Sequence, residues 1–194
     1  MNPNYKIKVF VSSMMKNSSY TNARKHLNHL IDGSKILQRT SVDDGGAADE
    51  HPNDNALRLL EQSHICVFLI NHKDGISKYV LEEHDLAKDK NIARLYYFCV
   101  KEPALSKKDR NKIIAEGGKS SNDLCKELIG TEETREFSKQ FYEVDFFADA
   151  VIKAYDNILD TIAKSYVDYR LEQTARPILH SNDKELNIAT IGDI

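Results

Sequence analysis

The sequence lacks the short motifs that mark common metal and nucleotide sites. It has three cysteines, Cys66, Cys99 and Cys125, with no CxxC pair, and its seven histidines show no metal-site spacing. Neither G-x-G-x-x-G nor the Walker A pattern occurs, which disfavours a standard Rossmann or P-loop nucleotide site. We therefore expect no metal and no resident cofactor, and the cysteine usage favours a reducing, cytoplasmic compartment.

Long apolar runs and a strong charge of one sign are also missing. There is no stretch of about 18 apolar residues and no basic-then-apolar start, so neither a membrane span nor a secretory signal is predicted. The net charge is −3 and the pI about 6.2, which gives no general attraction to nucleic acid or to an anionic membrane. The 194 residues are 41% hydrophobic and 29% charged, a composition typical of soluble globular proteins.

Apolar runs alternate with helical patterns along the first hundred residues. The predicted strands are residues 5–13, 35–38, 64–70 and 93–100, and the predicted helices are residues 20–31, one from 53 or 54, and one from 77. The run HICVFLI is nearly continuous, as in a strand covered on both faces. The alternation predicts an α/β fold with a parallel sheet and helices on both faces. Ligands of such sheets bind at the carboxyl ends of the strands.

The second half of the chain has a different texture. Residues 101–118 predict a loop-plus-helix excursion, 123–129 a short helix, 141–145 a last strand or the lead-in to a long helix, and 147–172 that helix. At 1.5 Å per residue the long helix would span about 39 Å, so its far end should project or pack on another subunit. Our first interpretation is that this helix packs on its own domain. The second is that it forms the interface of a homo-oligomer. The expected units are a domain at 1–145, the helix at 146–173 and a tail at 174–194.

Glu83 breaks the pattern of the helix that begins near Ser77. Projected at about 100° per residue, Ile76, Tyr79, Val80, Leu86 and Ala87 share one face, and Glu83 falls at its centre. A carboxylate on such a face costs several kcal/mol unless something pairs with it. Broken patterns of this kind are expected at functional sites. The alternative is a carboxylate that snorkels or complements the helix dipole.

The segment around this glutamate resembles one in TIR domains. Ser77, Tyr79, Glu83 and Ala87 keep the register of the family's S-x-W-C-x-x-E-L-x-x-A pattern, with tyrosine for tryptophan and valine for cysteine. The opening KVFVSS is similar to the first TIR strand and to the "FVSST" start of an uncharacterised TIR-related domain. Arg24 lies near the position of an E-R pair in that domain, whose glutamate is missing here. The resemblance implies a flavodoxin-like, TIR-like sheet and, in catalytic members, cleavage of the nicotinamide–ribose bond of NAD.

Glycosidic cleavage suits a single carboxylate. The transition state resembles an oxocarbenium ion, whose charge a carboxylate can stabilise, and nicotinamide leaves without a general acid because it departs neutral from a cation. The resemblance therefore implies that Glu83 is catalytic and that NAD is a substrate, hydrolysed or cyclised, rather than a cofactor. By family analogy alone, the pathway would be bacterial antiviral defence or stress signalling.

Nucleoside deoxyribosyltransferases are similar in the same segment. They place a nucleophilic glutamate in an E-x-x-x-A setting, which Glu83 and Ala87 match. Their glycine two residues after the glutamate is Asp85 here, and Asp74 is a poor match for their upstream aspartate. This enzyme class is kept as a further alternative.

Two pairs of polar residues are candidates for contact with a substrate. Ser12 and Ser13 end the first strand, where hydroxyls and backbone N–H groups could meet phosphate or ribose, although a plain strand-to-turn transition fits equally well. Asp43 and Asp44 precede Gly45-Gly46 and take the place of the mobile BB loop of TIR domains. They could contact ribose or a neighbouring subunit, and a solvated loop is the alternative.

The helix of Glu83 supplies three further candidates. Tyr79 replaces the family tryptophan and could stack on a base or on nicotinamide, or else pack in the core. Ser77 would help to shape the pocket, whereas His84 is expected at the surface. The rival to an enzyme is a non-catalytic TIR-like module that binds a nucleotide-derived signal or a protein partner and keeps Glu83 as a ligand contact.

Overall fold

The computed structural model describes residues 6–14, 18–40, 52–124 and 139–175. The chain divides into two compact units, Met1–Asn157 and Ile158–Ile194. The first unit holds a five-stranded sheet, and the long helix α6, Phe147–Ala175, begins in it. None of the described helices combines the length and apolar character that crossing a membrane requires.

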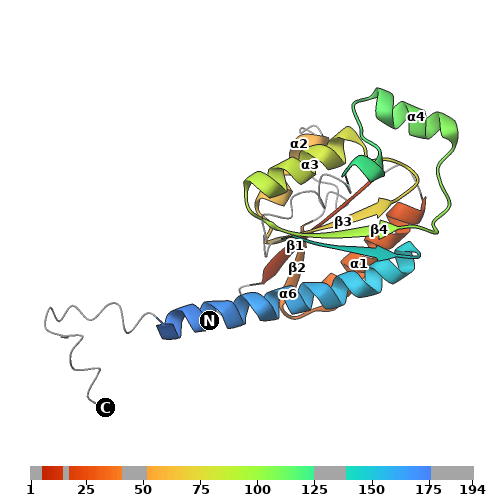
Figure 1. Cartoon of the computed structure of the whole chain (residues 1–194). Coiled ribbons are helices and arrows are strands. Elements are labelled where there is room, and N and C mark those ends of the chain that lie inside the picture. The colour runs from red at the N-terminus through yellow and green to blue at the C-terminus, as the bar shows by residue number, and fades with distance from the viewer. Residues whose placement is uncertain (1–5, 15–17, 41–51, 125–138, 176–194) are drawn as a thin grey trace, which may run out of the picture. The chain divides into compact units, whose positions relative to one another are not determined.

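All strand pairs of the sheet are parallel, and the strand order is β2-β1-β3-β4-β5. The strands are β1 Ile7–Ser13, β2 Leu37–Thr40, β3 Ile65–Asn71, β4 Ala93–Cys99 and β5 Lys139–Val144. Among the described residues, the helices before α6 include α1 Ser18–Gly33, α2 Pro52–Glu61, α3 Lys78–Asp89 and α4 Lys107–Ala115. Helices α2 and α3 cover one face, and α1 and the start of α6 the other (Figure 1). The predicted α/β fold with a long C-terminal helix is therefore confirmed.

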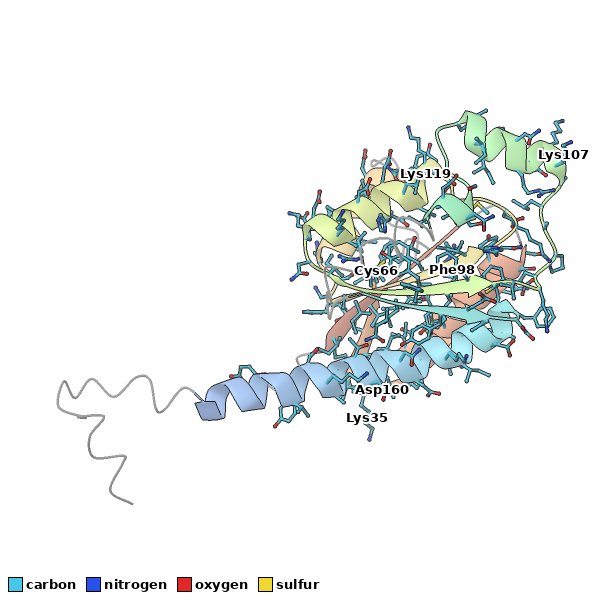
Figure 2. All side chains as sticks on the ribbon, in the orientation of Figure 1. Lys35, Cys66, Phe98, Lys107, Lys119 and Asp160 are labelled. Carbon is cyan, nitrogen blue, oxygen red and sulfur yellow. The ribbon has the colours of Figure 1, made fainter. Side chains whose placement is uncertain are left out.

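The core lies in the central strands. All seven residues of β3 are buried, as expected for a parallel strand covered on both faces. Cys66 and Phe98, on neighbouring strands, lie among the side chains that fill the space between the helices (Figure 2). On the α6 side, the hydroxyl of Tyr97 accepts a hydrogen bond from Nδ2 of Asn157 at 2.8 Å.

The strand order creates a topological switch point between β1 and β3. The chain leaves β1 toward β2 on one side, and the later strands extend on the other side of β3. Ser13 ends β1 and pairs with Leu69, while Asn71 ends β3. In flavodoxin-like sheets, ligands bind in the crevice outside the carboxyl ends of the strands at this point. The element that follows β3 is α3, the helix of Glu83.

Several predicted boundaries shift in the structure. The strand predicted at 35–38 is β2, Leu37–Thr40. Of the two alternatives for residues 141–145, the strand holds: β5 is Lys139–Val144, and α6 begins only at Phe147. The helix predicted to begin at 53 or 54 is α2, which begins at Pro52, and proline suits the first positions of a helix. The described part of the predicted 123–129 helix begins at residue 121, with 125–129 outside the described residues.

Candidate functional site

Helix α3 is fixed at both ends. At its start, the side chain of the N-cap residue Ser77 accepts a hydrogen bond from the Val80 N–H at 3.4 Å. At its end, Nη1 of Arg94 donates to the Ala87 carbonyl oxygen at 2.9 Å, and Arg94 is only 2% exposed. A cation at a helix C-terminus is favourable because it complements the helix dipole. These contacts hold Glu83, in the middle of the helix, in a defined place.

Glu83 is a buried acid. The residue is 8% exposed, and Val80 and Ala87 are buried beside it on α3. Ser12 Oγ, near the end of β1, donates a hydrogen bond to Glu83 Oε2. Burial raises the pKa of Glu83 from 4.5 to about 7, against the opposing effects of the Ser12 hydrogen bond and of the positive charge of Arg24. The acid therefore changes its charge near neutral pH.

The two serines that end β1 serve opposite faces of the sheet. Successive strand residues point to opposite sides, so Ser12 meets Glu83 on the α3 face while Ser13 meets α1. Ser13 Oγ accepts a hydrogen bond at 3.0 Å from Nη1 of Arg24, a buried residue of α1. One strand end thus joins a buried cation and a buried carboxylate, and we call Ser12, Ser13, Arg24 and Glu83 the strand-end cluster.

A second pair of contacts fixes α3 against the sheet next to the strand-end cluster. His84 Nδ1 lies 2.8 Å from the Tyr96 hydroxyl oxygen, and Tyr96 stacks on Phe68 with ring centroids 4.8 Å apart. Phe68 pairs in register with both Ser12 and Tyr96. Glu83 and His84, adjacent on α3, therefore contact hydroxyl groups of the same cross-strand row.

A separate polar cluster closes the carboxyl end of β3. The hydroxyl of Tyr20, on α1, accepts from the Asn71 N–H at 3.0 Å and lies 3.4 Å from Asp74 Oδ2, to which it donates. The Leu105 N–H donates to Asp74 Oδ1 at 2.6 Å. Burial raises the pKa of Asp74 and that of the Tyr20 phenol. This cluster ties α1, the loop before α3 and the chain after β4 together beside the switch point.

The structure brings together some of the predicted site residues and separates others. Ser12 contacts Glu83, while Ser13, its neighbour on β1, contacts Arg24 on the opposite face of the sheet. Ser77 uses its hydroxyl as a helix cap. Tyr79 is 49% exposed, so the alternative of core packing is wrong for this residue, and Nζ of Lys78 lies 5.7 Å from its ring centroid. Asp43 and Asp44 lie outside the described residues.

The prediction for His84 is wrong. Its side chain is only 12% exposed, because the ring turns toward the Tyr96 hydroxyl instead of toward water. A helical projection gives the direction of the residue, but it does not show that a tyrosine lies within reach. Among the residues that the structure describes, no group of three His, Cys, Asp or Glu side chains could hold a metal ion.

Sequence reasoning left Arg24 out of the site, although the signal was present. On α1, Arg24 is buried on the same face as Tyr20, Ala23, Leu27 and Ile31. It is a charge inside an apolar helix stripe, as Glu83 is. The same rule that identified the glutamate could therefore have identified its cationic neighbour.

No protein-family model matches this chain, and no curated protein matches it in sequence. Among solved structures it is similar to translation elongation factor SelB from Methanococcus maripaludis in complex with the GTP analogue GppNHp, at 14% identity and a TM-score of 0.52. That match covers 82% of this chain but only 34% of the SelB chain. At this identity the likeness concerns the fold alone.

Two smaller structures are similar over most of their own length. The RPS4 and RRS1 TIR domain heterodimer matches 80% of this chain and 97% of the other, at 12% identity and a TM-score of 0.43. A conserved protein from Enterococcus faecalis V583 matches 75% and 95%, at 12% identity and a TM-score of 0.42.

Proposed function

We propose that this protein cleaves the N-glycosidic bond between nicotinamide and ribose in NAD, with Glu83 as the catalytic carboxylate. The observation that carries the proposal is the place of this buried acid, on the helix that follows β3 at the β1/β3 switch point. The resemblance of the Ser77–Ala87 segment to TIR domains supports the choice of NAD.

The reaction needs one carboxylate and one water molecule. The bond between the anomeric carbon and the pyridinium nitrogen breaks, and its electron pair stays on nitrogen, so nicotinamide leaves as a neutral molecule. The ribose carbon becomes oxocarbenium-like, and the Glu83 carboxylate stabilises that positive charge. Water adds to the carbon and loses a proton, which gives ADP-ribose.

The electrostatics of the strand-end cluster support this role. The pKa of Glu83 is about 7, so at neutral pH a substantial fraction of the protein carries the carboxylate that the reaction requires. Because only that form stabilises the cation, the rate should rise with pH through about 7. Tyr79, about half exposed at the start of α3, is the aromatic side chain that we assign to stacking on nicotinamide.

The first test measures nicotinamide release from NAD by chromatography at high protein concentration. Wild type should release nicotinamide, while Glu83→Gln should remain folded, because glutamine nearly keeps the shape of glutamate, and lose release by about 100-fold or more. Asp85→Asn is the matched control: it removes a negative charge from the same helix at a side chain that is 75% exposed, and should retain activity. Equal release by wild type and Glu83→Gln would contradict the assignment of Glu83.

One observation favours a non-catalytic binding module as the second candidate. The Glu83 carboxylate already accepts the Ser12 hydrogen bond, and the residue is 8% exposed, so it could serve only to join α3 to β1. A module of this kind would release no nicotinamide at any pH and would still be stabilised against heat by a bound nucleotide.

Incubation with a 2′-deoxynucleoside and a second free base tests the transferase alternative. Base exchange in that assay would replace NAD cleavage as the reaction.

A further inference from the structure

The strand-end cluster contains a cation that the proposed reaction does not itself use. Arg24 is 6% exposed and comes from α1, whose apolar face packs on the sheet. Burying a guanidinium is costly unless an opposite charge and hydrogen bonds compensate it. The 3.0 Å hydrogen bond to Ser13 supplies one part of this compensation. Glu83, whose pKa the charge of Arg24 lowers, supplies an opposite charge.

Adjacent residues of β1 contact the two ions. Ser12 and Ser13 are neighbours on β1, and their hydroxyls contact Glu83 and Arg24 respectively. A shift of Arg24 would move Ser13 and, through the backbone, the hydroxyl that holds the carboxylate. Helices α1 and α3 lie on opposite faces of the sheet (Figure 1), so the end of β1 is the element that both Arg24 and Glu83 contact.

We propose that Arg24 is a positioning residue for Glu83: its hydrogen bond to Ser13 anchors the end of β1, where the neighbouring Ser12 hydroxyl holds the carboxylate. In the native protein the role is electrostatic and geometric, without contact with the substrate. The name "positioning residue" rests on the proposed function of Glu83. The effect on the charge of Glu83 does not, and it can be measured without any substrate.

The other charged groups near Glu83 either raise its pKa, opposite to Arg24, or affect the pKa of a different residue. The negative charge of Glu82, on α3 itself, raises the pKa of Glu83. On β3, the buried Cys66 thiol has a raised pKa, caused first by burial and then by Glu83. The guanidinium of Arg94, at the start of β4, lowers the pKa of that thiol. Among the described groups that affect Glu83, Arg24 is therefore the cation that favours its ionisation.

The test follows the ionisation of Glu83 by carbon-13 NMR of side-chain carboxyl groups in the full chain. Arg24→Met should move the titration midpoint upward from about 7, because the positive charge that lowers the pKa of Glu83 is lost. Arg24→Lys keeps the charge and should leave the midpoint near that of wild type. Lys25→Met, an exposed position of α1, removes the same charge and should leave the midpoint unchanged.

Two outcomes would overturn the inference. An Arg24→Met midpoint that coincides with that of Lys25→Met would show that the buried guanidinium does not act on Glu83. If Arg24→Met fails to fold, Ser13→Ala decides, because it removes the hydrogen-bond acceptor and leaves the guanidinium in the protein. The midpoint should then still rise, and an unchanged one would refute the role of Ser13 as an anchor.

Turnover separates this inference from the proposed function. If wild type releases nicotinamide, Arg24→Met should lower kcat at pH 7, leave KM for NAD nearly unchanged and recover activity at higher pH. A structural defect would lower activity at every pH. If wild type releases none, the proposed function fails, while the NMR titration still tests the link between Arg24 and Glu83.

Discussion

Glu83 should make the protein less stable as the pH rises, and Glu83→Gln should remove that effect. Burial raises the pKa of this acid from 4.5 to about 7 in the folded chain, so between these values the folded state binds more protons than the unfolded state. Stability therefore falls as the pH rises through that window, and above about 7 no further change comes from this group.

The size of the effect follows from the two pKa values. At about 1.36 kcal/mol per pH unit, the gap between 4.5 and about 7 corresponds to about 3 kcal/mol. At pH 8 the charged Glu83 destabilises the folded wild type by this amount, and at pH 4.5 it does not. The glutamine of the variant is neutral at both pH values. The Glu83→Gln variant should accordingly gain stability relative to wild type as the pH rises, up to about 3 kcal/mol.

Urea unfolding at several pH values between 4.5 and 8 measures this difference directly. Titration of all the other acids cancels in the comparison, because wild type and variant share them. Asp85→Asn, with its exposed side chain, should change stability by less than about 0.5 kcal/mol at every pH. A Glu83→Gln difference that stays flat over the whole range would refute the conclusion that burial dominates the energetics of this acid.

Two further predictions concern the elements around the site. Ser77→Ala removes the N-cap that accepts from Val80 N–H and should lower the free energy of unfolding by about 1 kcal/mol, while Ser77→Asp should restore most of it in urea unfolding. Gly118→Ala would place a Cβ 2.4 Å from the Ile76 carbonyl oxygen, so the loop before α3 must shift, and a loss of more than about 1 kcal/mol is expected. Gly33→Ala is its control, because a Cβ there meets nothing within 4 Å; equal effects at both glycines would contradict the steric argument.

Element types were predictable wherever the local pattern was strong. The continuous apolar run became β3, and the period of 3.6 in the last third of the sequence became α6. Boundaries were less predictable, as β2 shows, because a strand begins and ends where a neighbouring strand offers hydrogen bonds. Leu37–Thr40 pairs with Ile7–Phe10 of β1, and the sequence around β2 carries no record of that register.

The roles of the site residues divide in the same way. The position of Glu83 on an apolar helix face and the capping role of Ser77 depend on helix geometry alone. Both can therefore be inferred from the local sequence. The substrate, the cytoplasmic location and a homo-oligomer seam along residues 147–172 stay predictions. So do the three expected units of the chain.

By itself the sequence determined which face of each element is apolar and that Glu83 interrupts one of those faces, because the direction of a side chain follows from helix and strand periodicity. Only the tertiary structure decided what the acid meets. Ser12 and Glu83 are 71 positions apart, and Arg24 comes from the helix on the other face of the sheet. They converge because the strand order places the end of β1 beside β3, and strand order is a property of the whole chain rather than of any segment.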